Sequence, residues 1–238
     1  MFIDIYLKER NIEMNDSKRR FLKSSIGIVG GLVTVNALSA EWVQSICTSI
    51  TPKQPEGPFY PINEQLDSDN DLTILEGSTK RAKGQIVYTK GIVQDQYCNP
   101  VQDALVEIWQ ACASGKYNHP NDPNEAELDP DFQYYGKSVT NEKGEYLFKT
   151  ILPGSYPAAE DWIRPSHIHF KVHKRNYTEL TTQMYFEGLQ YNAEDLILNA
   201  LNEDEKKSVI VKLEPPTIDL EPQAQLCRFD LSIVKIKK

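Results

Sequence analysis

The 238-residue sequence predicts an all-β fold, an antiparallel β-sandwich with long loops and one short helix. Several short segments alternate apolar and polar residues with a period of two and are rich in β-branched and aromatic side chains. Asn, Gly and Pro turns bound these segments, and no strand-helix unit repeats along the chain. The composition, with 40% hydrophobic and 25% charged residues, excludes collagen-like, coiled-coil and wholly disordered proteins.

Residues 1–40 differ in kind from the rest and are predicted to be an export signal. The basic run Ser17–Lys23 precedes a short, Gly-rich apolar stretch that ends in small residues. This stretch is shorter than a typical membrane-spanning helix. The run resembles a twin-arginine signal with Lys18 and Arg19 at the paired positions. We therefore expect export to the periplasm by a twin-arginine-like route, with membrane contact only during export. An amphipathic N-terminal helix is the alternative, and Met14 is an alternative start.

The remainder divides into an arm over residues 41–81 and a β-sandwich catalytic domain over residues 82–238. Four prolines within Thr51–Pro61 favour an extended arm. The predicted strands of the domain cover, in order, residues 85–95, 104–111, 145–152, 166–174, 180–186, 208–213 and 226–234. Only residues 193–201 have helical spacing. A long loop rich in Asn, Asp and Pro covers residues 118–135, and we expect its acidic side chains at a solvated surface.

Charge bears on the class of partner. The chain has 26 Lys and Arg against 34 Asp and Glu, a formal net charge of −8. Because a phosphate-binding face needs clustered basic residues, this balance argues against a nucleic-acid partner. The sequence leaves open whether the chain forms homo-oligomers.

All four cysteines lie after the predicted signal, where an oxidising compartment permits disulfides. An extended strand over residues 103–111 would hold Cys98 and Cys112 too far apart to bond. The complete pairings that remain join Cys47 to Cys98 or to Cys112, and free buried thiols, including Cys227, stay open.

Two of the four histidines, His167 and His169, are separated by one residue. On a strand such residues point to the same face, with Cα atoms about 6.5 to 7 Å apart, so both imidazoles can converge on one metal ion. Two hydrogen-bonded, half-buried histidines are the alternative. We expect a surface role for His173 and an exposed position for His119.

The residues around this pair bear on the kind of metal. The sequence near the pair has no carboxylate at facial-triad spacing and no pattern of zinc-thiolate ligands. Tyrosine is abundant, with twelve in the chain. A phenol becomes an anionic ligand only when a strongly Lewis-acidic cation displaces its proton, which favours a hard trivalent ion such as Fe(III). Composition does not indicate which tyrosines would serve.

Five motifs in order resemble those of the intradiol ring-cleavage dioxygenases, closest to the protocatechuate 3,4-dioxygenase branch, and the resemblance spans residues 51–234. These are residues 51–61 (TPKQPEGPFYP), 100–111 (PVQDALVEIWQA) leading to 115–117 (GKY), 150–157 (TILPGSYP), 164–170 (RPSHIHF) and 182–186 (TQMYF). The resemblance implies a β-sandwich that holds a mononuclear non-haem Fe(III). By matching motif positions, the ligands would be Tyr117, Tyr156, His167 and His169, with Tyr156 the phenolate that leaves when the substrate binds.

The same resemblance implies the reaction. A small aromatic diol of the catechol type binds, and O2 cleaves its ring between the two hydroxyl-bearing carbons. Arg164 would stabilise negative charge on the activated ring, and Gln183 would orient substrate or the oxygen adduct. The resemblance implies protocatechuate or a related diol as substrate. Members of this branch commonly carry Trp two residues after the axial Tyr, where this chain has Ala158, and this departure in the pocket favours a diol other than protocatechuate itself. A non-catalytic exported β-sandwich that binds a ligand, and a copper or zinc enzyme with a His-x-His pair, are the alternatives.

Overall fold

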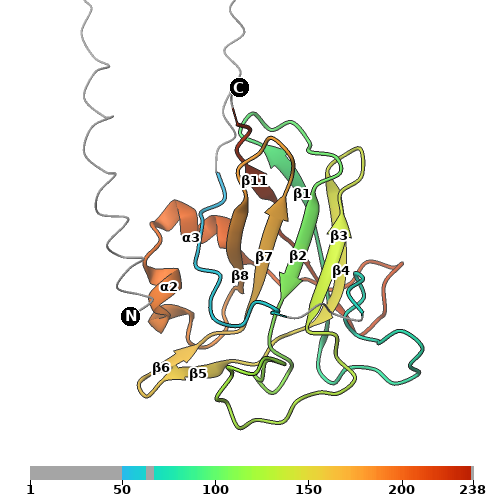
Figure 1. The fold of residues 1–238 in the computed structure, drawn as a ribbon, viewed down its shortest axis with the longest axis vertical. Helices are drawn as coiled ribbons and strands as arrows, with labels where there is room; N and C mark the ends of the chain where they lie inside the picture. The colour runs from blue at the N-terminus through green and yellow to red at the C-terminus, as the bar shows by residue number, and fades with distance from the viewer. Residues whose placement is uncertain (1–49, 63–66, 237–238) are drawn as a thin grey trace, which may run out of the picture. The chain divides into compact units, whose positions relative to one another are not determined.

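The computed structural model describes residues 50–62 and 67–236; the predicted signal, Met14 and Cys47 lie outside these residues. Within them the chain forms strands β1 to β11, one 3-10 turn and two short helices (Figure 1). In chain order these are β1 (Ile86–Asp95), β2 (Leu105–Trp109), β3 (Tyr135–Val139), β4 (Glu145–Ile151), β5 (Tyr156–Ala159), β6 (Trp162–Arg164), β7 (His167–His173), β8 (Leu180–Phe186), η1 (Asn192–Glu194), α2 (Leu196–Asn199), α3 (Glu203–Val209), β9 (Ile210–Val211), β10 (Gln225–Arg228) and β11 (Leu231–Ile233).

Two sheets make the sandwich. One has the order β3-β2-β7-β8-β9, and the other pairs β1 with β4, β10 and β11. Aromatic side chains join the two layers, with the Phe148 and Phe170 ring centroids 6.4 Å apart and those of Phe170 and Phe229 5.0 Å apart. The prediction of an all-β sandwich is confirmed, and strands β1, β2, β4, β7 and β8 fall within the predicted segments.

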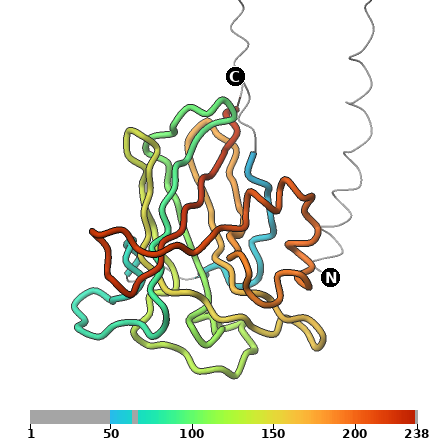
Figure 2. Tube along the Cα trace, turned by 180° about the vertical axis from the view of Figure 1, so that it is seen from behind, coloured from blue at the N-terminus to red at the C-terminus, as the bar shows by residue number. Residues whose placement is uncertain are grey.

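Most strand pairs are antiparallel, as expected, but the sheets are mixed, because β1 pairs in parallel with β10 and β11, and β8 with β9. Val87 pairs with Gln225 and Val93 with Leu231, which is the same offset, so β10 and β11 are one predicted strand interrupted at Phe229 and Asp230. The C-terminal segment reaches β1 by a long crossover behind the first sheet, which parallel pairing requires (Figure 2).

The helical prediction is only partly correct. Residues 193–201 form η1 and α2, whereas α3 occupies residues expected to begin a strand at 208. Asn202 accepts hydrogen bonds from the backbone N–H groups of Asp204 and Glu205, and the Glu205 side chain returns to the Asn202 N–H. This capping box explains why a helix starts here rather than a strand.

The arm lies beside β8 and then turns across β7 toward β2 (Figure 1). The Gln54 N–H donates to the Thr181 carbonyl at 2.9 Å, and the Gln54 Oε1 accepts from the Gln183 N–H at 2.9 Å. These bonds cover a part of β8 that β9 leaves unpaired. None of the helices in residues 50–62 and 67–236 has the length and apolarity needed to cross a membrane.

The cysteines of the described residues do not all form disulfides. Cys98 is disulfide-bonded, whereas Cys112 and Cys227 are free and buried. Both complete pairings left open by the sequence are therefore wrong, and the alternative of free buried thiols holds for Cys112 and Cys227.

Candidate metal centre

The alternation of β7 divides its side chains between two environments. Ile168, Phe170 and Val172 point into the sandwich core, and His167 and His169 point to the opposite face, under the arm. Their Nε2 atoms face each other at 3.2 Å. The His167 Nδ1 bonds the Pro165 carbonyl at 2.7 Å, an acceptor that places the proton on Nδ1 and leaves Nε2 as the ligand atom.

Two loops bring Tyr117 and Tyr156 to this face, and glycines allow the loops to meet backbone to backbone. A Cβ added at Gly115, whose φ is +85°, would lie 2.4 Å from the Ser155 carbonyl oxygen. A Cβ added at Gly154 would lie 2.5 Å from the Ala113 carbonyl oxygen. Glycine is therefore required in both tyrosine motifs because any side chain would separate the two loops.

The four aromatic side chains form a closed circle. Ring centroids are 5.7 Å apart for Tyr156 and His167, 4.9 Å for His167 and His169, 6.3 Å for His169 and Tyr117, and 5.4 Å for Tyr117 and Tyr156. The Tyr117 hydroxyl is buried and has no hydrogen-bond partner within the described residues. A buried hydroxyl without a partner is costly, so this atom fits the role of a metal ligand.

The protonation states also fit a metal ion. Burial, helped by the Arg164 charge, holds the pKa of both His167 and His169 well below the usual value, so both imidazoles are neutral and able to coordinate. Burial raises the pKa of Tyr117 and Tyr156, while Arg164 acts against the rise at Tyr156. These phenols would ionise only against a strong Lewis acid.

The described residues hold no cluster of three or more His, Cys, Asp or Glu side chains suited to a metal ion. The rings beside the two histidines are those of Tyr117 and Tyr156, so an ion held by this circle of side chains would use tyrosine oxygen. Phenolate oxygen is a hard ligand, which favours a hard, highly charged cation over copper or a zinc-thiolate site.

Arg164 adds a fixed positive charge beside the circle of rings. On β6 it pairs with Tyr156 on β5, so one hairpin carries both side chains. Its Nε donates to Asp195 Oδ2 at 2.7 Å, and its Nη2 donates to Gln183 Oε1 at 2.6 Å and to the Tyr185 hydroxyl at 3.3 Å. Burial opposes the charge, but Tyr185, Tyr156 and Asp195 more than offset it and raise the Arg164 pKa above its ordinary value.

The structure thus brings together all six predicted site residues, Tyr117, Tyr156, Arg164, His167, His169 and Gln183. His173 is half exposed, as expected, and bonds Glu107 and Glu179 at 3.1 and 3.0 Å.

For this loop, the expectation for His119 is wrong, and the expectation of solvated acidic side chains holds for Glu125 and Glu127 but not for Asp122. His119 is buried rather than exposed, and its ring lies 5.8 Å from that of Phe59. Asp122 is buried as well, because its Oδ2 accepts from the Tyr117 N–H at 2.7 Å and its Oδ1 from the Asn124 N–H at 2.9 Å. This loop carboxylate therefore holds the backbone of a candidate ligand.

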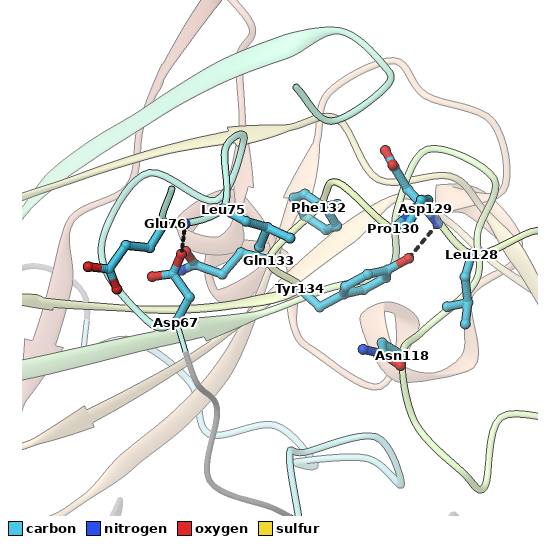
Figure 3. Close-up of a pocket in the computed structure, with 10 residues that line it drawn as sticks. All are labelled: Asp67, Leu75, Glu76, Asn118, Leu128, Asp129, Pro130, Phe132, Gln133 and Tyr134. Carbon is cyan, nitrogen blue, oxygen red and sulfur yellow. Dashed lines mark hydrogen bonds between the residues drawn. The ribbon is translucent and has the colours of Figure 1, made fainter. Parts of the chain in front are cut away.

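A separate pocket of about 580 Å³ lies between the same loop and the segment before β1 (Figure 3). Its lining residues are Asp67, Leu75, Glu76, Asn118, Leu128, Asp129, Pro130, Phe132, Gln133 and Tyr134. None of the six site residues lines it. Asp129 is committed to the fold, since its Oδ2 accepts from the Lys83 N–H at 2.6 Å.

Comparison with known proteins agrees with this geometry. The protein family described as "Dioxygenase" matches residues 55–232, which is most of the chain. The chain is 33% identical over 201 residues to a protocatechuate 3,4-dioxygenase beta chain from Burkholderia cepacia, covering 77% of this chain and 85% of that protein. This chain belongs to the intradiol ring-cleavage dioxygenase family.

Other similarities place this dioxygenase within the family more broadly. It is 28% identical to a catechol 1,2-dioxygenase from Candida albicans over 78% of this chain, and the match spans 62% of that protein. Its fold is similar to that of a 3-chlorocatechol 1,2-dioxygenase from Rhodococcus opacus, with a TM-score of 0.62, 26% identity and coverage of 78% and 73% of the two chains. This dioxygenase is therefore an oxidoreductase of the intradiol type.

Sequence reasoning missed Gln54 and Asp195, which hold the Arg164 and Gln183 pair from two sides. The Gln54 Nε2 donates to the Tyr185 hydroxyl at 3.2 Å, and the Gln183 Nε2 donates to the Pro55 carbonyl at 2.9 Å. The only local signal for Asp195 is its place as an Asp just before an apolar helical stretch, which indicates an N-cap but not its contact with Arg164.

Proposed function

We propose that this dioxygenase binds one non-haem Fe(III) through Tyr117, Tyr156, His167 and His169. Its reaction is cleavage of a catechol-type diol, protocatechuate or a relative, between the two hydroxyl-bearing carbons, with both atoms of O2 entering the product. The observation that carries this proposal is the closed circle of two neutral imidazoles and two phenols around the unpartnered Tyr117 hydroxyl. The relatives named protocatechuate and catechol dioxygenases support the substrate class.

Fe(III), when bound, supplies a Lewis acid that favours the deprotonated diol. The protein supplies a base and a fixed cation. Tyr156 would accept at its Oη the proton that leaves the diol hydroxyl. Arg164 stands across the β5–β6 hairpin from Tyr156 and stabilises the negative charge that develops on the deprotonated ring.

The small side chains of the β5–β6 hairpin affect which ring substituents we expect the substrate to carry. Ala158 and Ala159 on β5 are exposed and small. We infer that these small side chains leave room for a ring substituent of the diol beside Tyr156. We expect turnover of more than one ring-substituted catechol.

The test compares the parent with Tyr156→Phe after loading with iron. We expect a visible tyrosinate-to-Fe(III) absorption band in the parent, a shift of this band when a catechol is added without oxygen, and a diacid product that contains two 18O atoms from 18O2. In Tyr156→Phe the band should weaken and turnover should fall. A parent that stays colourless and iron-free after reconstitution would contradict the proposal and favour the ligand-binding alternative.

We also propose that the protein is exported to the periplasm by a twin-arginine-like route. The basic run Ser17–Lys23 and the disulfide at Cys98, a bond typical of oxidising compartments, support it. Cell fractionation of the parent and of the double variant Lys18→Gln/Arg19→Gln tests it. Retention of the variant in the cytoplasm is expected, and equal export of both would contradict it.

A further inference from the structure

We propose that Asp195 is a positioning residue that acts through Arg164, setting the direction in which the guanidinium donates to the substrate. The effect of Asp195 on catalysis rests on the proposed function, whereas its anchoring of Arg164 does not. Asp195 lies between η1 and α2, outside every motif of the family resemblance, and its side chain is completely buried. A carboxylate without solvent needs partners for both oxygens, and the two that it has belong to different parts of the fold.

One oxygen holds the helix and the other holds the arginine. Asp195 Oδ1 accepts from the Leu198 N–H at 2.7 Å, which caps α2. Asp195 Oδ2 accepts from Arg164 Nε at 2.7 Å. The carboxylate thus links the N-terminus of α2 directly to the β5–β6 hairpin that carries Tyr156.

The carboxylate itself cannot move freely. The backbone carbonyl of Asp195 accepts from both the N–H and the Nδ2 of Asn199, each at 2.9 Å. Leu198 is buried in the main core and anchors the same turn. Arg164 is consequently tied to the packed interior rather than to a mobile loop.

The remaining contacts define the orientation of the guanidinium. Asp195 takes Nε, and Gln183 and Tyr185 take Nη2, so the planar group is held along two of its three nitrogens. Within the described residues, none of these bonds uses Nη1. With the guanidinium group held in this orientation, Nη1 is the nitrogen that remains to donate a hydrogen bond to negative charge on the substrate.

The first test separates anchoring of Arg164 from capping of α2. In Asp195→Asn, one amide oxygen can still cap the Leu198 N–H, but the amide nitrogen then faces the Arg164 Nε–H, donor against donor. We expect kcat to fall about 10- to 100-fold with a smaller change in KM, because a displaced guanidinium loses its contact with charge that develops during reaction. The matched control is Asn202→Ala, which removes the cap of α3 and touches no site residue; it should lower Tm and leave kcat unchanged.

A double-mutant cycle tests whether Asp195 acts through Arg164. If it does, Asp195→Asn should cost little further activity in an Arg164→Gln background, whereas a merely structural role would lower activity by the same factor in both backgrounds. Equal losses in the two backgrounds would overturn the proposal. Asp195→Ser, which also caps helices well, replaces Asp195→Asn in the cycle if the latter does not fold.

A second readout does not depend on turnover. In the 1H–15N spectrum of the iron-free protein, we expect a slowly exchanging Arg164 Nε–H signal, assigned by its loss in Arg164→Lys. It should persist in Asn202→Ala and exchange rapidly in Asp195→Asn. Absence of this protected signal in the parent would overturn the anchor, whatever the activity. A protected signal in a parent without ring-cleaving activity would instead contradict the proposed function.

Discussion

Buried polar atoms without partners gather around the proposed iron site. Trp109 Nε1, Tyr117 Oη, His119 Nε2, Trp162 Nε1 and His169 Nδ1 are all of this kind. The Trp109 ring stacks on His169 with centroids 4.7 Å apart, so the group extends behind the metal ligands. Gln133 Oε1 and Asn192 Oδ1 are the other two unpartnered atoms of the described residues, so the grouping of the remaining five, rather than their presence alone, favours a ligand here.

Tyr117→Phe tests this idea at one atom. We expect the iron-free variant to be as stable as the parent or more so, because the hydroxyl removed has no partner. Affinity for iron should fall at least about 10-fold, as it does when the support of a metal ligand is lost. Thermal melts without iron and iron content after dialysis measure the two effects.

Tyr146→Phe is the matched control, because the buried Tyr146 hydroxyl donates to the Phe229 carbonyl within the core. It should lower stability and leave iron affinity unchanged. Loss of stability in Tyr117→Phe of the same size as in Tyr146→Phe would show that the Tyr117 hydroxyl has a structural partner.

The free thiol of Cys227 provides a test of burial in the core. Burial raises the pKa of Cys227 to about 12, although the Thr89 hydroxyl opposes the rise. Because only the thiolate reacts, roughly one molecule in ten thousand would be reactive at this position at pH 8. We expect iodoacetamide to leave Cys227 unmodified in the native protein and to modify it in guanidinium, as measured by peptide mass mapping. Rapid native modification at Cys227 would contradict its burial.

Among the elements, the two tyrosine loops depend on each other. Gly154→Ala places a Cβ within 2.5 Å of both the Ala113 carbonyl oxygen and the Gly115 nitrogen, so the loops must separate. We expect a stability loss of about 1 to 3 kcal/mol, typical of overpacking, together with reduced iron content. Gly77→Ala is the control: the positive φ of Gly77 strains the backbone of that variant, but nothing lies within 4 Å of the added Cβ. Equal iron content in the two variants would contradict the loop contact.

The arm is the other element on which the site depends. Gln54 is buried and bonds Gln183, Thr182 and Tyr185. Gln54→Ala leaves these groups unsatisfied, so we expect a loss of about 1 to 3 kcal/mol and a fall in kcat, because Gln183 holds Arg164. Differential scanning calorimetry and steady-state kinetics measure both. The exposed Gln223→Ala is the control and should change neither; unchanged kinetics in Gln54→Ala would show that the arm contributes stability alone.

For the whole molecule, the site and the core are separate. The main core lies between the two sheets, whereas Trp109, Tyr117, Tyr135 and Tyr156 form a second cluster on the outer face. We expect removal of iron by a chelator to abolish activity and to leave the β-sheet circular dichroism intact. If iron stands at 100 times its Kd, its loss costs about 2.7 kcal/mol. For a domain of this size that lowers Tm by about 5 to 11 °C. Unfolding on chelation would contradict this separation.

Features that depend on near neighbours along the chain could be predicted from the sequence. The His167 and His169 pair could be placed on one face because strand alternation is local. The strands that alternate clearly were found for the same reason, and the capping box of Asn202 and Glu205, although overlooked, was also readable. Tyr117, Tyr156, Arg164 and Gln183 came from resemblance to a family, since neither composition nor spacing distinguishes them from other residues of their types.

The contacts between these residues could be read only from the folded structure. Gln54 and Tyr185 are 131 positions apart, and Asp195 reaches Arg164 across 31. Such contacts depend on which strands pair and on where loops cross, and the parallel return of the C-terminal segment to β1 shows that this pairing was not predictable from local pattern. The local sequence does not distinguish a buried carboxylate such as Asp122 or Asp195 from a solvated one, because the burial comes from distant segments that fold against it.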